Sequence, residues 1–299
     1  MRVLIYAANR GSMIVSLMVR HFFSSPRRAV VLSTLVASLF LAQCNRDRPE
    51  PVPAEPVVVD PTPEQAAVTP TTLNRSDLLA ATARAASAYA AGEQVRGADP
   101  LVGRPFSLRV PFGCNGPQPT AAESAGDGLA RWSWGTENKI IELGLTPGDW
   151  LNTALISGVA EGANWEAVEG FWIPRPWLRT GDCSTVRADP LQSGEGAPSP
   201  QTVGLAAVFK ADDSRVGRRN GRAYSFTIRP TGDAPLVAPV GGYRIILEGR
   251  LASFPDGRAI HCRASSPDQR PVCIAAIRLD RVAFTAADSS VLISEWRAG

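Results

Sequence analysis

The feature that most constrains the fold is a two-residue alternation of apolar and polar side chains, which starts near residue 105 and recurs toward the C-terminus. Residues 106–110 (FSLRV) and 141–145 (IELGL) are two such runs. A period of two places successive side chains on opposite faces of a β-strand. Clusters of Pro and Gly, such as 147–148 and 255–257, interrupt the runs as turns between strands do. The sequence therefore predicts an all-β body built as a β-sandwich.

The C-terminal half contains the clearest strand predictions. Val203–Lys210 and Tyr224–Arg229 flank the dipeptide Asn220-Gly221. This dipeptide is preferred in the type I′ turns of β-hairpins, so the two segments are predicted to pair. Farther on, apolar residues keep one phase from Cys273 to Leu279 and take the opposite phase after Asp280-Arg281. An extra residue in one strand shifts the phase in this way, so we predict a β-bulge near Asp280-Arg281.

One α-helix is predicted ahead of the strands, within Leu73–Gly92. Asn74 or Ser76 can cap its first turn, and the negative charge of Asp77 suits the positive end of the helix. The apolar positions at helical spacing are mostly alanine, and Gly92 supplies a stop. Such a face offers little apolar surface, so the helix must pack on another element to be stable.

The N-terminal segment has the proportions of a secretory signal. Arg27 and Arg28 precede an apolar run, Ala29–Ala42, that ends close to Cys44. The run is shorter than the roughly 20 apolar residues that a membrane-spanning helix needs. A basic entry, an apolar middle and a small-residue exit are typical of an export signal. The next stretch, residues 45–73, is so rich in proline that neither helix nor sheet can form, which predicts a flexible tether.

The residues Leu41-Ala42-Gln43-Cys44 resemble the lipobox of bacterial lipoproteins, although that family has Gly, Ala or Ser where Gln43 stands. The resemblance implies that residues 1–44 are a lipoprotein signal peptide and that Cys44 carries the lipid. It also implies a mature chain that is anchored to a membrane of the cell envelope and faces the periplasm. Asn45 after the cysteine is similar to lipoproteins that are passed on to the outer membrane.

The resemblance covers the signal only. Residues 74–299 are predicted to be one mainly β domain of no recognised family. Within it, residues 188–201 are rich in Pro, Gly and Ser, which is typical of a long loop or of a seam between two smaller β modules.

The charge of the mature chain argues against general binding to polyanions. The whole sequence has a formal net charge of +3, but the residues before Cys44 include five arginines and no acidic residue. The mature chain keeps 26 basic and 28 acidic groups, a net charge of about −2. We therefore expect no nucleic-acid partner.

The cysteines predict two disulfide bonds. If Cys44 carries lipid, an even number of cysteines remains in an exported chain: Cys114, Cys183, Cys262 and Cys273. Cys262 and Cys273 end and begin consecutive predicted strands, so a hairpin would bring them together, which leaves Cys114 with Cys183. A metal site is the competing interpretation. Because His261 is the one histidine after Cys44 and no CxxC occurs, we predict no metal and no other cofactor.

The sequence contains none of the common catalytic motifs. The patterns G-x-S-x-G, H-E-x-x-H, G-x-G-x-x-G and the P-loop are absent. Glycoside hydrolysis is an alternative, because it needs two carboxylates near a surface on which sugars stack. Glu166 and Glu169 lie among Trp165, Trp172 and Trp177. We assign no catalytic residue from the sequence.

Two further groups of side chains are candidate binding sites. Six of the seven tryptophans fall between residues 132 and 177. Exposed, they would form a platform for sugar rings, and buried, they would form the core of the sandwich. The candidate platform consists of Trp132, Trp134, Trp172 and Trp177. The candidate anion site around the Asn220-Gly221 turn, which could equally be a solvated loop tip, consists of Arg215, Arg218, Arg219 and Arg222.

These observations favour a non-catalytic envelope protein that binds or supports another envelope component. The membrane would be its partner through the lipid on Cys44. Peptidoglycan, another polysaccharide or an assembly protein would be the second partner. The competing class is a carbohydrate-active hydrolase that uses Glu166, Glu169 or another acid. An exposed tryptophan ledge beside two facing carboxylates would favour the enzyme, whereas tryptophans inside a closed sandwich would favour the binding or structural role.

Overall fold

The computed structural model describes residues 70–93, 96–118, 126–185, 200–211, 217–289 and 291–298, all within one compact unit that extends from Gln65 to Gly299. The predicted signal peptide with Cys44, the tether up to residue 69, Arg215 and most of the segment 188–201 lie outside the described residues. The elements of the described part, in chain order, are α1 (Arg75–Ala90), β1 (Pro105–Phe112), β2 (Ala130–Trp134), the short 3-10 helix η2 (Thr136–Asn138), β3 (Ile141–Leu145), β4 (Gly148–Asp149), β5 (Trp165–Trp172), β6 (Val203–Lys210), β7 (Tyr224–Ile228), β8 (Tyr243–Leu251), β9 (Ile260–Arg263), β10 (Val272–Ala286) and β11 (Leu292–Arg297).

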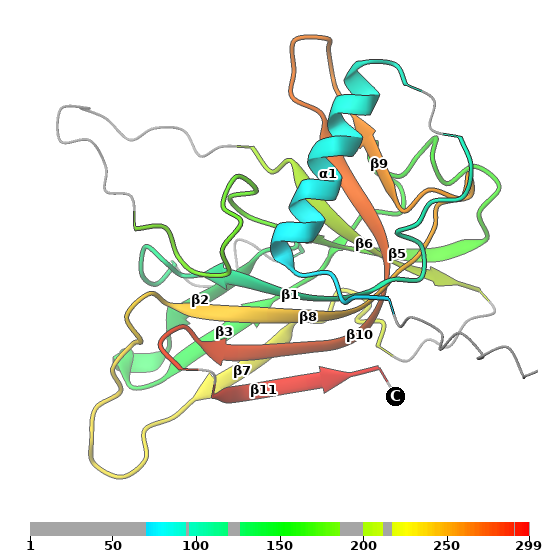
Figure 1. The fold of residues 1–299 in the computed structure, drawn as a ribbon. Coiled ribbons are helices and arrows are strands. Elements are labelled where there is room, and N and C mark those ends of the chain that lie inside the picture. The colour runs from blue at the N-terminus through cyan, green and yellow to red at the C-terminus, as the bar shows by residue number, and fades with distance from the viewer. Residues whose placement is uncertain are drawn as a thin grey trace, which may run out of the picture. The chain divides into compact units, whose positions relative to one another are not determined.

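Within the described ranges, the strands form two sheets (Figure 1). The larger, eight-stranded sheet has the order β1-β8-β10-β6-β5-β4, and β9 and β11 also pair with β10. The smaller sheet has the order β2-β3-β7. Paired strands are antiparallel except β6 and β10, which are parallel.

The long strand β10 organises the larger sheet. Its first half pairs with β9 and β6, and its second half pairs with β8 and β11. The register of β10 against β8 shifts between Leu279 and Arg281, which confirms the predicted bulge. Because the bulge adds one residue, Ile277 and Val282 lie on the same face of the sheet although their spacing is odd.

The main core lies between one face of the larger sheet, the smaller sheet and α1. Phe171 of the larger sheet packs against Tyr224 of the smaller one, and Tyr243 packs against Trp132, with ring centroids 6.4 and 5.8 Å apart. Leu78 of α1 joins the same core and is fully buried. A second, smaller core contains Trp150, Ile156, Val168, Ala206, Phe254, Ile274 and Ala276. The prediction of an all-β, sandwich-like body preceded by one helix is therefore confirmed.

The helix begins where the sequence predicts. The Asn74 side chain accepts the backbone N–H of Asp77 at 3.0 Å, and the Asp77 carboxylate accepts the backbone N–H of Asn74 at 3.0 Å. This reciprocal pair satisfies two backbone donors at the helix start. The buried side of α1 contacts β1, β9 and β10, so the helix is stabilised by the larger sheet.

The predicted hairpin between Val203–Lys210 and Tyr224–Arg229 is wrong. β6 lies between β5 and β10, which occupy both of its edges, and β7 pairs with β3 in the other sheet. The local turn is nevertheless correct, because φ is positive at both Asn220 and Gly221, as a type I′ turn requires. β6 begins with five successive buried residues, and a strand that is buried on both faces gains most from a central place in a sheet. Tertiary burial therefore overrode the local hairpin signal.

Candidate functional site

Both predicted disulfide bonds are confirmed. Cys114 is bonded to Cys183 and Cys262 to Cys273, with Cα atoms 5.5 and 4.0 Å apart. Cys262 and Cys273 are directly opposite each other in the β9–β10 ladder, as the hairpin argument requires. The other bond joins the chain just after β1 to residues 174–185, which we call the 174–185 loop. This bond fixes the loop to the end of the edge strand β1.

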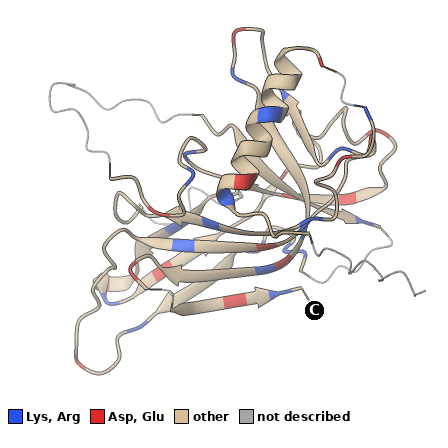
Figure 2. Cartoon of the chain, in the orientation of Figure 1, with Lys and Arg blue, Asp and Glu red and all other residues tan. Residues whose placement is uncertain are grey.

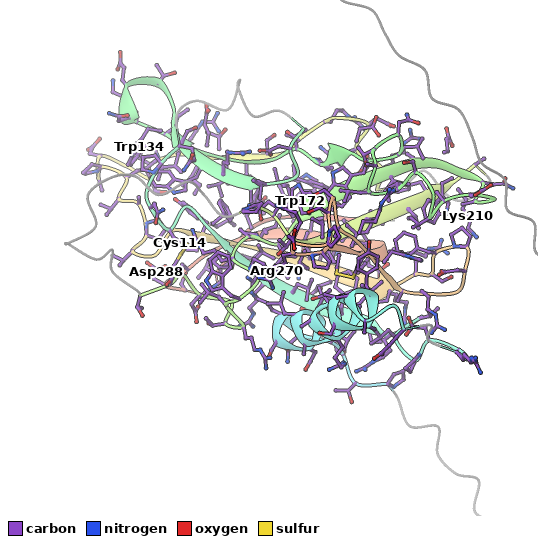
Figure 3. All side chains as sticks on the ribbon, turned by 90° about the horizontal axis from the view of Figure 1, so that it is seen from above. Cys114, Trp134, Trp172, Lys210, Arg270 and Asp288 are labelled. Atoms are coloured by element: carbon purple, nitrogen blue, oxygen red, sulfur yellow. A yellow bond between two sulfur atoms is a disulfide. The ribbon has the colours of Figure 1, made fainter. Side chains whose placement is uncertain are left out.

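The four candidate platform tryptophans do not share one surface. Trp132 is buried, and its ring meets that of Trp134 edge-on with centroids 5.7 Å apart. Trp172 packs against Trp150 in the second core, with centroids 4.7 Å apart. Figure 3 shows Trp134 and Trp172 in separate parts of the body. Trp177, in the 174–185 loop, is 56% exposed and is the one of the four that presents most of its side chain to solvent.

The structure brings the candidate carboxylates to the candidate arginines. The Oε1 atom of Glu169 accepts the backbone N–H groups of Arg219 and Asn220, at 2.7 and 2.8 Å. Glu166 forms an ion pair with Arg218 at 3.2 Å. The candidate carboxylates and the candidate arginines, which the sequence presents as separate sites, therefore contact each other where β5 meets the 217–222 turn.

Glu169 is a buried carboxylate on the side of β5 that faces this turn. Burial raises its pKa, and the two backbone hydrogen bonds and the charges of Arg218 and Arg219 offset part of that effect. Trp172 lies three residues farther along the same strand and so on the opposite face. A sugar stacked on Trp172 would therefore be separated by the sheet from this carboxylate, and these residues do not form the combination that a glycoside hydrolase needs.

The arginines near the turn contact other groups of the chain. The guanidinium carbon of Arg219 lies 4.6 Å from the ring centroid of Tyr224, a cation–π contact. A hollow of about 320 Å³ beside the turn is also lined by Arg281 and Arg297. Both of these arginines pair with Glu295, at 2.8 and 3.2 Å. The arginines of this hollow are therefore held by contacts within the chain, although Arg222 has no acidic partner in the described ranges.

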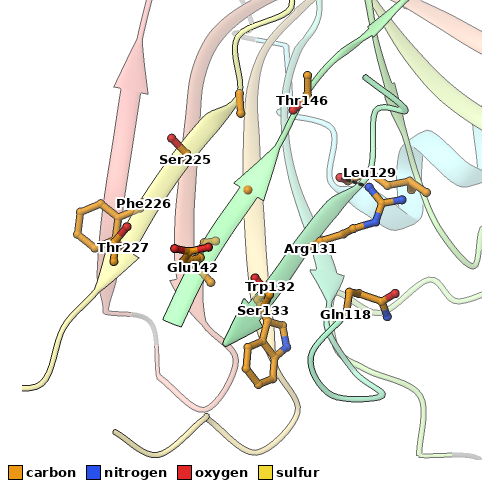
Figure 4. Close-up of a pocket in the computed structure, with 13 residues that line it drawn as sticks. Gln118, Leu129, Arg131, Trp132, Ser133, Glu142, Thr146, Ser225, Phe226 and Thr227 are labelled. Carbon is orange, nitrogen blue, oxygen red and sulfur yellow. Dashed lines mark hydrogen bonds between the residues drawn. The ribbon is translucent and has the colours of Figure 1, made fainter. Parts of the chain in front are cut away.

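The sequence does not predict a groove that lies on the outer face of the smaller sheet. It encloses about 280 Å³ and is lined by residues of β2, β3 and β7 and of the segments next to them (Figure 4). No atom lies within 4 Å of the position that a Cβ of Gly144 would take, so the middle of its floor is open. Two cross-strand rows of outward-facing residues form the floor: Arg131, Gly144 and Ser225 in one, and Ser133, Glu142 and Thr227 in the other.

The side chains of the groove offer both donors and acceptors of hydrogen bonds. Arg131, which lines the groove, is held by Asp127, with Nη1 2.7 Å from Oδ1, so its charge is balanced. The carboxylate of Glu142 makes no hydrogen bond or ion pair with any described residue. The hydroxyl groups of Ser225 and Thr227 line the side that β7 forms. This arrangement can bind a polar ligand without a metal, and the carboxylate of Glu142, unpaired within the described ranges, leaves the groove with a net negative charge.

Among the described residues, no helix is long and apolar enough to cross a membrane. In the same ranges, no group of three or more His, Cys, Asp or Glu side chains could hold a metal ion. No family model, curated protein or solved structure matches the chain. The geometry of the chain itself is therefore what indicates its function.

Proposed function

We propose that the chain is a lipid-anchored protein of the bacterial cell envelope that binds another envelope component and has no catalytic role. An acyl chain on Cys44 would hold it to the outer membrane on the periplasmic side. The lipobox-like residues 41–44 and the proline-rich stretch 45–73 support this proposal. The two disulfide bonds support it further, because such bonds form and persist in oxidising compartments such as the periplasm.

The groove of the smaller sheet is the observation that carries the binding role. Its hydroxyl groups, the carboxylate of Glu142 and the guanidinium group of Arg131 lie side by side on a shallow surface, which suits a ligand rich in hydroxyl groups. A volume of about 280 Å³ is just below the usual range for ligand pockets, which begins at about 300 Å³. The proposed ligand is therefore a short glycan segment, such as part of a peptidoglycan strand.

Substitution of Gly144 by glutamine tests the binding role. Gly144 has an ordinary strand φ and open space above it, so the new side chain would fill the groove without disturbing the core. We expect Gly144→Gln to weaken retention on peptidoglycan and on soluble glycan fragments by roughly tenfold, equivalent to about 1.4 kcal/mol. The control Ser265→Gln, in the exposed loop between β9 and β10, should bind as the wild type does. A folded Gly144→Gln protein that binds glycan as tightly as the wild type would refute the groove as the site.

Substitution of Cys44 by serine tests the anchor. The variant should leave the membrane fraction, and the N-terminal peptide of the wild-type protein should carry the mass of acyl chains. Co-sedimentation of Cys44→Ser with membranes to the wild-type extent would contradict the lipid anchor and leave the groove proposal unaffected.

A further inference from the structure

A second hollow lies where the start of α1, the edge strand β1 and the 174–185 loop meet. It encloses about 470 Å³, and its lining includes Arg75, Arg109 and Arg179. None of the described residues that line it is acidic. Figure 2 shows a basic position at the start of α1, with an acidic position next to it, and basic positions on the loops beside the helix. We call this site the Arg75 hollow.

Arg75 is a buried cation that has carbonyl groups as its described partners. It is 4% exposed, and it donates from Nε to Leu178 O at 3.0 Å and from Nη2 to Pro174 O at 2.8 Å. Burial, and after it the charge of Arg175, lower the pKa of Arg75 to about 10, so the guanidinium group stays charged at neutral pH. A buried charge without an opposite charge beside it is unfavourable. An anion held in the hollow would offset that cost.

Arg109 and Arg179 line the hollow from the solvent side. Both are exposed, and neither makes a hydrogen bond or ion pair with a residue in the described ranges. Of the acids on the adjoining segments, Asp77 caps α1, and Asp182 pairs with Arg244, although its charge also acts on Arg109. A guanidinium group binds phosphate in a bidentate geometry, through two parallel N–H···O hydrogen bonds. The hollow therefore suits a phosphate group.

Trp177 adds an aromatic ring in a neighbouring hollow, which shares Arg179 with the Arg75 hollow. It is 56% exposed and lies on the 174–185 loop between Arg175 and Arg179. Indole rings are enriched at the interface between membrane and water, where basic side chains also meet the phosphates of lipids. Thr72 and Leu73, through which the chain enters α1 from the side of the tether, line the hollow as well. The cations of the Arg75 hollow thus lie on the side where the tether joins the body, and Trp177 lines the next hollow along α1.

We infer that this side of the body docks on the anchoring membrane, with the phosphate of an anionic phospholipid headgroup in the Arg75 hollow and Trp177 at the level of the headgroups. This inference rests on the proposed lipid anchor at Cys44. The anchor holds the body close to the bilayer at an effective concentration on the order of millimolar, so a weak headgroup site is sufficient. The near-neutral charge of the whole mature chain does not oppose docking, because the local cluster carries the attraction.

The test uses the full lipidated protein in vesicles that contain brominated acyl chains, which quench nearby tryptophan. Vesicles of phosphatidylcholine are compared with vesicles that also contain phosphatidylglycerol. We expect stronger quenching with phosphatidylglycerol, and loss of that difference in Trp177→Phe. The pair Arg109→Gln and Arg179→Gln should lower the ratio of docked to undocked protein by roughly 30-fold, about a factor of five for each arginine at an anionic surface. The control pair Arg222→Gln and Arg229→Gln removes the same charge elsewhere and should leave the quenching unchanged.

Equal quenching in the two kinds of vesicle, or equal quenching in the two double variants, would overturn the docking. Binding of inorganic phosphate by the detergent-solubilised protein with no effect of phosphatidylglycerol would also overturn it, and would assign the hollow to a soluble phosphate ligand. Failure of the anchor is seen separately, as an N-terminal peptide without acyl chains. The protein without acyl chains is then linked through the thiol of Cys44 to a maleimide lipid in the vesicles, which keeps the effective concentration, and the dependence of quenching on phosphatidylglycerol decides the docking as before.

Discussion

Breaking the two disulfide bonds one at a time should cost the protein unequal amounts of stability. Cys114–Cys183 spans a sequence separation of 69 and Cys262–Cys273 a separation of 11. In the chain-entropy account, a cross-link destabilises the unfolded chain by an amount that grows with the logarithm of the ring size. For these separations the account predicts about 4.4 kcal/mol for the larger ring and about 2.8 kcal/mol for the smaller one.

Replacing the cysteines would mix this ring effect with a loss of packing. Cys262 and Cys273 are buried, so removing their sulfur atoms would leave cavities, at a cost on the order of 1 kcal/mol for each atom. Chemical reduction breaks the bond and keeps both sulfur atoms in place. The experiment therefore uses two double variants, Cys114→Ala with Cys183→Ala and Cys262→Ala with Cys273→Ala, and compares each in its oxidised and reduced forms.

Urea unfolding at neutral pH measures the two differences. Reduction should lower the free energy of unfolding by about 4.4 kcal/mol in the variant that keeps the larger ring and by about 2.8 kcal/mol in the other. The dependence of that free energy on urea should also steepen more when the larger ring opens, because the unfolded chain then exposes more surface. Equal losses, or a greater loss for the smaller ring, would refute chain entropy as the main contribution of these bonds.

Other changes test single contacts. Glu169→Gln keeps the acceptor oxygen, so its free energy of unfolding in urea at neutral pH should equal or exceed that of the wild type. Glu169→Ala leaves two backbone donors without an acceptor and should lower the free energy of unfolding by about 2–4 kcal/mol. Because burial raises the pKa of Glu169, the folded state holds its proton more tightly, so the wild type should lose stability relative to Glu169→Gln as the pH rises through that pKa; parallel pH profiles would contradict this. Deletion of Asp280 removes the bulge together with the phase slip, so Val282 and Phe284 should stay opposite Leu247 and Ile245 on the core side, and failure to recover a soluble, cooperatively unfolding protein would contradict this. Arg75→Met removes the donors that hold the 174–185 loop, and limited proteolysis should cut this loop faster than in the wild type.

The features that could be predicted from the sequence have causes within a few residues. The cap formed by Asn74 and Asp77 is one example, and the turn at Asn220-Gly221 is another. The phase slip at Asp280 is visible because the alternation on both sides is regular. The bond between Cys262 and Cys273 follows from a short hairpin, which leaves Cys114 and Cys183 as the other pair. In each of these cases, local geometry decides the outcome.

The features that could not be predicted depend on which surfaces meet. Glu169 and Arg219 are 50 residues apart, and a carboxylate among tryptophans gives no sign that a distant turn will cover it. Alternation places Glu142 on the face opposite Leu143, but it does not say whether another element covers that face. β7 cannot pair with β6, because β5 and β10 occupy both edges of β6. No short stretch of sequence shows that β6 will have these two neighbours.

Both candidate surfaces depend on strand pairing across the segment 188–201. The groove is built from β2 and β3, which precede this segment, and from β7, which follows it. The Arg75 hollow uses side chains that all precede it, yet β1 is held in the larger sheet by β8, which follows it. Each surface therefore exists only while strands from the two halves of the chain are paired. A loss of that pairing would remove glycan binding and membrane docking together, even though the residues that carry the two roles do not overlap.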